Sequence, residues 1–454
     1  MAGSSPSSSQ NSSKTVSPCD LVTLAEGLEC YGNERQMLTD MARFYNNEML
    51  SDVRLKVGDQ VYMAHKLVLA RASDVFEKML TSKWQDATKK EVQLVEDNVC
   101  LKVFPGFLKF LYTCHIQLNT DNTLPILILS DKYNVQDLRD VCIEFARTNI
   151  IPKLQLKDVF HVWFQYATKC YHQELITACV AALSEKMDDI TYSSEWEQEW
   201  ISLDREQLLE FLKCSDLTIK DEYELWQAVV RWLYSRTHPE RLIDLQDNLK
   251  EILSYIRFPM MQPDQLHELE TSHLMEQYPA LFMPYMMQAY KYNALSLSSR
   301  TSIKEFSSST FLLRNYSELR WDKRLVVRNY SQCQKCGEVS LRFSTRASSY
   351  PIQTWEWELK VYPKGFSSTS EDLRCILYSN LILEQPRPVE YKLSVVDEER
   401  LLCSVTGKKN FTKNRYTTDT EIDKKITVAD LCMPNTPYLV RDNLIFQISL
   451  RPME

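Results

Sequence analysis

Two cysteines separated by two residues, Cys333 and Cys336, have the spacing in this chain that is most typical of metal binding. A structural zinc site needs four ligands, which usually come from a second pair. No second Cys-x-x-Cys pair follows, and Cys375, Cys403 and Cys432 are single. We therefore expect no metal centre and interpret the pair as part of a hairpin loop between the first strands of the C-terminal region.

Cysteine and histidine also lie close together at Cys170 and His172, with His161 a few residues earlier. A cysteine nucleophile needs a base that a third group orients. The seven histidines form neither a His-Glu-x-x-His motif nor the order of a triad. Helix packing explains these residues better, so we expect no catalytic residues. A thiol or metal hydrolase that uses Cys170, Cys333 or Cys336 is the enzymatic alternative.

Acidic residues gather at Asp188-Asp189 and in the run from Glu195 to Trp200, which alternates acids with tryptophan. Paired carboxylates could serve acid–base catalysis or bind a cation. A solvated connection between two helices is the simpler interpretation, because charged runs usually face water.

Glycine is scarce, with 8 residues in 454. Loops that bind phosphate need glycines at close spacing, because only a backbone without Cβ approaches a phosphate closely. Gly27 and Gly32 have the spacing of a P-loop, but Asn33 and Glu34 follow where Lys and Ser or Thr are required. We therefore expect no nucleotide cofactor. The net charge of −8 also disfavours nucleic acid as the partner.

The compartment is indicated by the cysteines and by the first residues. Thirteen scattered cysteines, an odd number, favour reduced thiols over a disulfide scaffold. The Ser-rich segment 1–20 predicts a disordered tail and lacks the apolar run of a secretory signal. No stretch has the apolar length of a membrane span. The sequence therefore predicts a cytoplasmic protein with no membrane contact.

The rest of the chain divides by hydrophobic periodicity. Residues 21–150 mix helical and strand patterns, including a hairpin in which Val61 and Met63 continue the alternation of the strand 53–57. Residues 151–295 are helical throughout. A Ser-rich linker is predicted for 296–310, and the period changes to two in 311–454, which is typical of an antiparallel β-sandwich. The expected fold class is therefore multidomain α+β.

The first region carries residues in the order of a known family. The matching segments are Ser51-Asp52-Val53, Ala64 to Ser73, Phe76, Met79-Leu80, Phe110 to Thr113 and Asp131-Lys132-Tyr133. Residues 21–150 resemble a BTB/POZ domain of α/β type on these positions. In that resemblance His65 lies where a strand enters the first core helix, so we expect its ring to make buried hydrogen bonds.

Two further resemblances follow along the chain. Trp200 to Leu203, Ser215-Asp216-Leu217, Val230-Arg231-Trp232 and Ile256 to Pro259 make residues 151–295 similar to the all-α BACK domain of kelch-like proteins. Trp357 to Gly365, Val428 to Leu431 and Tyr438 to Asp442 make residues 311–454 similar to a TRAF/MATH sandwich. The chain thus resembles BTB–BACK proteins that end in a TRAF/MATH-like domain.

The resemblance implies an adaptor without enzymatic activity of its own. BTB domains are dimerisation modules, so we expect a homodimer through an apolar helix face that precedes the first strand. The contact candidates are Met37, Leu38, Met41 and Phe44. Many BTB proteins also bind the third cullin in ubiquitin ligases, through an apolar residue and a nearby acid. Trp84, Gln85 and Asp86 are the cullin-contact candidates.

TRAF/MATH domains hold extended peptides of a partner protein, and by resemblance Tyr391 and Phe411 are the candidates for the peptide groove. The Trp-Gly-Phe-like segment of related adaptors is absent here, and residues 419–425 stand in its place. The recruited partner is therefore unknown. A scaffold or adhesion-type protein without a ligase role is the alternative, and some relatives are secreted.

Overall fold

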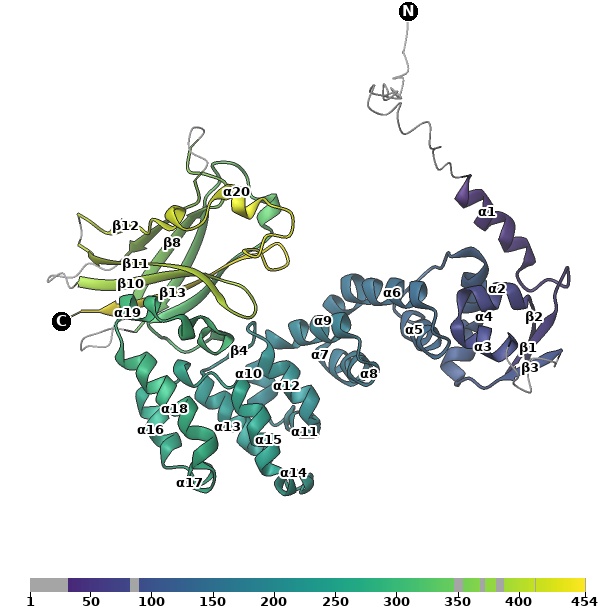
Figure 1. Ribbon diagram of the computed structural model, residues 1–454, viewed down its shortest axis with the longest axis horizontal. Helices are drawn as coiled ribbons and strands as arrows, with labels where there is room; N and C mark the ends of the chain where they lie inside the picture. The colour runs from purple at the N-terminus through teal and green to yellow at the C-terminus, as the bar shows by residue number, and fades with distance from the viewer. Residues whose placement is uncertain are drawn as a thin grey trace, which may run out of the picture. The chain divides into compact units, whose positions relative to one another are not determined.

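The computed structural model describes residues 32–81, 90–346, 354–367, 372–380, 388–412 and 414–453 (Figure 1). The chain divides into two compact units, residues 1–150 and 151–454. In the described residues, no helix combines the length and apolar character that crossing a membrane requires.

The first unit is built on a three-stranded sheet of order β2-β1-β3, with β1 at Val53–Val57, β2 at Gln60–Ala64 and β3 at Glu91–Leu94. β1 and β2 are antiparallel, whereas β1 and β3 are parallel. The helices are α1 (Glu34–Met41), α2 (Lys66–Ala72), α3 (Asp74–Thr81), α4 (Asn98–Thr113), α5 (Thr123–Lys132) and α6 (Gln136–Phe145).

The predicted hairpin exists, but the side chains of its second strand that enter the core are those predicted to face away from it. Leu55 pairs with Tyr62, and both side chains are buried. Directly paired residues point to the same face of a sheet. Tyr62 and Ala64 therefore enter the core, and Val61, expected there, is 43% exposed. The tight turn at Gly58, where φ is +58°, sets this register.

One helix of the first unit contains a proline. Proline is normally tolerated only in the first turn of a helix, but α4 begins at Asn98 and Pro105 lies in its interior. The helix continues because its apolar face is deeply buried, at Phe104, Phe107, Leu108 and Leu111. Tertiary packing therefore outweighs the loss of one backbone hydrogen bond.

The second unit opens with an array of helices. They are α7 (Leu156–Asp158), α8 (Gln165–Cys170), α9 (Gln173–Ser184), α10 (Met187–Tyr192), α11 (Glu197–Ser202), α12 (Arg205–Lys213), α13 (Glu222–Leu233), α14 (Glu240–Ile243), α15 (Leu245–Ile252), α16 (Pro263–Glu270), α17 (His273–Gln277) and α18 (Pro279–Ala294). Helix α13 begins at a side-chain cap, because the Asp221 carboxylate accepts a hydrogen bond from the Glu224 amide at 2.8 Å.

The C-terminal part is the expected sandwich of two antiparallel sheets (Figure 1). One sheet has the order β11-β10-β13-β6, with strands Leu401–Asn410, Pro388–Val396, Leu444–Pro452 and Asp322–Val327. The other has the order β12-β9-β8-β7, with strands Thr417–Asp419, Arg374–Ser379, Trp355–Tyr362 and Val339–Thr345. A short helix, α20 (Val428–Leu431), precedes β13. Alternate residues of the strands fill the core between the sheets, as the period of two predicts.

The segment predicted as a Ser-rich linker is folded. It forms α19 (Leu297–Ser302) and two short 3-10 helices, Lys304–Ser307 and Ser309–Phe311. Ser296 caps α19 by accepting a hydrogen bond from the Ser299 amide. The buried side chains of Leu297, Phe306 and Phe311 anchor the segment. Ser296 therefore supplies a helix cap rather than flexibility.

Candidate interaction surfaces

Helix α1 begins at a defined cap. The Asn33 side chain accepts a hydrogen bond from the Gln36 amide at 3.1 Å. After α1, the Tyr45 hydroxyl donates to the Pro105 carbonyl at 3.0 Å and so ties this end of the helix to α4. The cap defines where α1 begins, and the Tyr45 bond fixes the chain after it against α4.

The apolar face of α1 is incompletely covered within one chain. Met37 is 67% exposed, and Leu38, Met41 and Phe44 are half-buried. These are the four residues that the sequence predicts for the dimer contact. The exposure of their apolar surface is consistent with a surface that a partner covers.

His65 anchors the neighbouring loop, as expected. Its ring nitrogens lie 2.9 Å from the Tyr112 hydroxyl and 2.8 Å from the Met49 carbonyl oxygen. The Phe44 ring meets the His65 ring edge-on at 5.7 Å. Burial raises the pKa of Tyr112 to about 12, so this hydroxyl stays a neutral hydrogen-bonding group.

Sequence reasoning missed three exposed apolar side chains near His65, namely Met49, Leu50 and Leu67. Met49 bonds to the His65 ring, and Leu67 follows His65 by two residues. Periodicity assigned Leu67 to a helix but could not show that it faces water. All three add exposed apolar area to the first unit.

The cullin-contact candidates Trp84, Gln85 and Asp86 lie outside the described residues. They follow α3, which ends at Thr81, and precede β3, which begins at Glu91. Their role stays a prediction from the sequence.

The two groove candidates on the sandwich lie inside it. Tyr391 and Phe411 are buried in the core between the sheets, and the Phe411 ring packs edge-on against Trp357 at 5.2 Å. The Tyr391 ring covers Gly407, its partner on β11. The prediction of a peptide groove at these residues was therefore wrong, because both side chains fill the space that joins the two sheets.

The helices and the sandwich of the second unit are joined by a two-stranded parallel pair. β4 (Thr218–Ile219) lies between α12 and α13, and β5 (Asn315–Tyr316) lies just before the sandwich. In addition, the Gln447 side chain of β13 bonds to the backbone of Phe311 and Leu313. The sandwich is thus continuous with the helical array through backbone hydrogen bonds.

A fully buried carboxylate lies at the centre of this joint. Glu222, at the start of α13, pairs with the Arg314 guanidinium at 3.1 Å and accepts a hydrogen bond from the Tyr316 hydroxyl at 2.7 Å. It also accepts the backbone N–H of Arg257 at 2.8 Å. Arg257 in turn donates to the Leu312 carbonyl at 3.0 Å. One acid therefore binds groups from both sides of the joint.

The electrostatics of the joint follow from its burial. Burial would raise the pKa of Glu222, but Arg314 and Arg257 outweigh it and hold that pKa below its usual value. Burial and the charge of Arg314 lower the pKa of Arg257 to about 9, with Glu222 opposing them. The carboxylate is thus ionised. It pairs with the Arg314 guanidinium and accepts the backbone N–H of Arg257, whose side-chain charge also favours the ionised acid.

Comparisons with known proteins match each part of the chain. Family models match as the BTB/POZ domain at residues 41–150, BTB And C-terminal Kelch (BACK) at 160–270 and the BTBD17 TRAF domain at 311–388. The chain therefore carries a BTB domain, a BACK domain and a TRAF domain of the BTBD17 type, in that order.

The chain is similar to curated relatives that are distant in sequence. BTB/POZ domain-containing protein 17 of Xenopus tropicalis is 24% identical over 92% of this chain and 90% of its own length. Kelch-like protein 24 of Rattus norvegicus is 23% identical over 76% of this chain and 52% of its own length. Among solved structures, the BTB domain of zebrafish PATZ1 has 22% identity and a TM-score of 0.22, over 27% of this chain and 100% of that one.

A cleft of about 680 Å³ opens between the BACK helices α9 and α12 and the TRAF sandwich. Its charged side chains pair as Lys213 with Glu210 at 2.6 Å, Arg324 with Asp216 at 2.8 Å and Arg441 with Glu398 at 2.8 Å. The Lys213–Glu210 pair lies within the BACK domain, and the Arg441–Glu398 pair lies within the TRAF domain. The Arg324–Asp216 pair joins the two domains. The three pairs leave the cleft without a dominant charge.

The cysteine pair of the TRAF domain lies in a connection between sheets. Cys336 has φ near +61°, and the Gly337 amide donates to the Gln334 carbonyl at 3.0 Å, which makes a tight turn. The turn joins β6 to β7, which belong to different sheets. The expected hairpin is therefore a crossover between the two layers.

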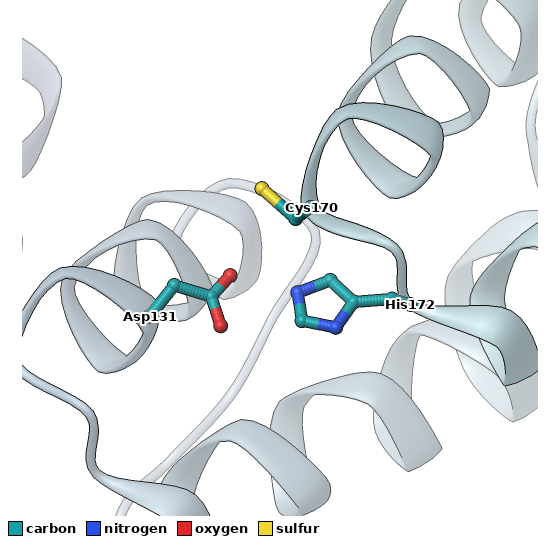
Figure 2. A group of neighbouring side chains, drawn as sticks. All are labelled: Asp131, Cys170 and His172. Atoms are coloured by element: carbon teal, nitrogen blue, oxygen red, sulfur yellow. The ribbon is translucent and has the colours of Figure 1, made fainter.

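The cysteine and histidine of the BACK domain flank one turn (Figure 2). Cys170 ends α8, Tyr171 has a left-handed backbone, and His172 precedes α9. His161 instead bonds to Glu199 at 3.0 Å. The third labelled residue, Asp131, belongs to α5 of the BTB unit and accepts a hydrogen bond from Arg139 at 2.6 Å.

The acidic run of the BACK domain is more than a solvated connection. Glu199 is buried, and one of its oxygens binds Lys157 at 2.6 Å as well as His161. Burial alone would raise the pKa of Glu199. The hydrogen bonds from Lys157 and His161 outweigh this effect and hold the pKa below its usual value. Lys157 also lies over the Trp196 ring at 4.0 Å. The expectation of solvent exposure was therefore wrong for Glu199, because a lysine bridges it to the core.

Proposed function

We propose that this chain is a homodimeric adaptor that binds the third cullin and recruits a partner protein through its TRAF domain. The observation that carries the proposal is the joint at Glu222. It holds the TRAF sandwich on the BACK helices in one compact unit. An adaptor that presents a partner to a ligase needs a recruiting domain held at a defined position.

The exposed face of α1 supports the dimeric part of the proposal. Met37, with the half-buried Leu38 and Met41 of α1 and Phe44 of the 3-10 turn that follows, offers apolar side chains at helical spacing. Obligate dimers bury surfaces that resemble a protein core. The same face on a second chain is the simplest occupant, since a two-fold axis pairs a surface with itself.

The segment after α3 supports the cullin part. Trp84 supplies an apolar side chain and Asp86 an acid at the position that BTB relatives of the ligase class use. A buried interfacial aromatic often contributes about 2 kcal/mol or more to binding. Asp86 is one methylene shorter than glutamate, so its reach is shorter by about 1.5 Å.

The test is titration calorimetry of the full-length chain against the N-terminal domain of the third cullin. Trp84→Ala should weaken binding by roughly thirtyfold or more, since each 1.4 kcal/mol is about tenfold. Asp86→Ala should weaken it less, and Asp86→Glu should keep or strengthen it. The matched control is Ile243→Ala, which removes an apolar side chain that is 84% exposed on the BACK domain.

Each outcome decides a separate part of the proposal. No measurable binding by the unmutated chain would exclude the ligase role and favour a scaffold. If the unmutated chain binds the cullin domain and Trp84→Ala binds it as strongly as Ile243→Ala does, the cullin remains a partner but Trp84 is not its contact.

A further inference from the structure

Arg257 is a buried cation at the joint of the BACK and TRAF domains that has no carboxylate partner. It is 3% exposed, and its guanidinium donates only to neutral groups, the Leu312 carbonyl at 3.0 Å and the Ser215 hydroxyl at 2.7 Å. The Glu222 carboxylate accepts the backbone N–H of Arg257 but pairs with the guanidinium of Arg314. Among the residues that the structure describes, no acid forms an ion pair with the Arg257 side chain.

The charges that act on Arg257 leave one positive charge in excess. Arg257 and Arg314 carry two positive charges, and Glu222 supplies one negative charge. The neighbouring Tyr316 and Cys214 stay neutral, because burial raises the pKa of both. Burial and the charge of Arg314 lower the pKa of Arg257 to about 9, as expected for a cation without its own anion. Buried charges are normally paired, so an anion at Arg257 would be stabilised.

Arg257 is also accessible to a ligand, because it belongs to the lining of the cleft between the two domains. A guanidinium has five N–H donors. The bonds to Leu312 and Ser215 use two of them and leave three. The cleft volume of about 680 Å³ lies within the range of ligand pockets, about 300 to 1,000 Å³.

The rest of the lining suits a peptide that carries this anion. The three ion pairs of the cleft are neutral in sum. Glu399 is a further acid of the lining, but it is exposed, so water screens its charge. Ser309 and Thr310 add hydroxyls, and Val180 and Val440 add apolar surface from the two domains. These groups can contact the backbone and the neutral side chains of a bound segment.

We propose that this cleft binds an acidic side chain of the recruited partner, with its carboxylate on the Arg257 guanidinium. The inference rests on the proposed role of the TRAF domain in recruiting a protein. A carboxylate carries one negative charge, which matches the single charge in excess, whereas a phosphate group carries about −1.5 to −2 at pH 7. The planar guanidinium also matches a carboxylate in geometry.

The test is peptide capture by the full-length chain. The probes are three pools of decapeptides with blocked ends and uncharged random positions. The central residue is Asp or Glu in the first pool, Asn or Gln in the second and phosphoserine in the third. We expect the acidic pool to be captured about tenfold more than the amide pool, because a charge-assisted hydrogen bond to Arg257 forms only with the acid. Equal capture of these two pools, or stronger capture of the phosphoserine pool, would overturn the proposal.

Three variants test the location. Arg257→Gln removes the charge and should abolish the preference for the acidic pool. Because Arg257 also bonds within the joint, Ser309→Trp is a second variant that fills the cleft from an exposed position and keeps Arg257. It should lower capture of the acidic pool by about tenfold. Ser302→Trp is the matched control, because Ser302 is exposed on α19 outside the cleft lining. Capture that Ser309→Trp and Ser302→Trp leave equally strong would overturn the proposal.

Cullin calorimetry of the same chain separates this inference from the proposed function. A chain that binds the cullin domain but captures the acidic and amide pools equally would overturn the cleft site and leave the adaptor role. A chain that prefers the acidic pool without binding the cullin domain would support the cleft site and reject the ligase role.

Discussion

Tyr391 of β10 and Gly407 of β11 are paired across the two strands. They show how much of a side chain's location the sequence at one position predicts. Alternation places Tyr391 on one face of a strand but not on a particular face. Family resemblance suggested a groove, whereas the structure places the ring in the core over a residue without a side chain. The decisive signal was Gly407, because a glycine inside a strand often marks a close approach.

The contact predicts a specific steric clash. A Cβ at Gly407 would lie 2.3 Å from the Tyr391 hydroxyl oxygen and 2.7 Å from a ring carbon. Gly407→Ala should therefore lower the free energy of unfolding by about 1 to 3 kcal/mol, as overpacked cores do. Chemical denaturation of the variant and the unmutated chain measures this difference in the free energy of unfolding. Adding Tyr391→Leu should recover part of the loss, and strictly additive effects of the two changes would contradict the contact.

The buried Glu222 gives a prediction with a pH dependence. Glu222→Gln leaves Arg314 and Arg257 without their anion and should cost about 3 to 5 kcal/mol at neutral pH. The pKa of Glu222 is lower in the folded chain than in the unfolded one. Its stabilisation is therefore present above the unfolded value near 4.5 and is lost as the pH falls through the folded value.

Denaturation at several pH values checks this prediction. The loss caused by Glu222→Gln should shrink as the pH falls below about 4.5. Glu224→Gln on the same helix is the control, because Glu224 makes a surface pair with Lys220 and should matter by less than about 1 kcal/mol. A loss equal to that of Glu224→Gln would show that Glu222 does not stabilise the joint.

At the scale of elements, the sequence predicted which helices and strands form, but not how their neighbours place them. The strands β8, β10 and β13 and the helices α2 to α6 follow from periodicity, because apolar residues that enter a core repeat at the spacing of each element. The phase of β2 did not follow, since it depends on the turn at Gly58. The fold of residues 296–310 did not follow either, because Ser296 acts as a helix cap and the anchors Leu297, Phe306 and the adjoining Phe311 are isolated apolar side chains.

That segment covers Lys392, which predicts a stabilising substitution. With a pKa of about 8 in the folded chain against 10.5 unfolded, keeping Lys392 charged at pH 7 costs the fold about 2 to 3 kcal/mol. Lys392→Met should remove most of this cost and raise the melting temperature. The gain should vanish as the pH rises towards about 10.5, where the unfolded lysine also loses its proton.

Thermal unfolding with a matched variant checks the origin of this gain. Lys408→Met, at an exposed position of the adjacent strand, should change stability by no more than about 0.5 kcal/mol. If Lys392→Met destabilises the chain at pH 7, the lysine has a favourable partner and the pKa argument fails.

At the scale of the molecule, the order of domains was predictable and their joining was not. Residue patterns indicated a BTB, a BACK and a TRAF region, and the family models match all three. The joint could not be foreseen, because β4 and β5 are two residues long and pair across almost a hundred positions of sequence. The partners of Glu222 are likewise distant along the chain, and no local pattern marks them.

The most direct test of the central claim is the mass of the complex that the full-length chain forms with the N-terminal domain of the third cullin, measured by light scattering. A dimeric adaptor predicts two chains with two cullin domains. Met37→Glu places a charge on the exposed face of α1 and should reduce the complex to one of each. Met433→Glu, at an exposed methionine of the TRAF domain, should leave it unchanged. A chain that stays monomeric, or that never joins the cullin domain, would contradict the account.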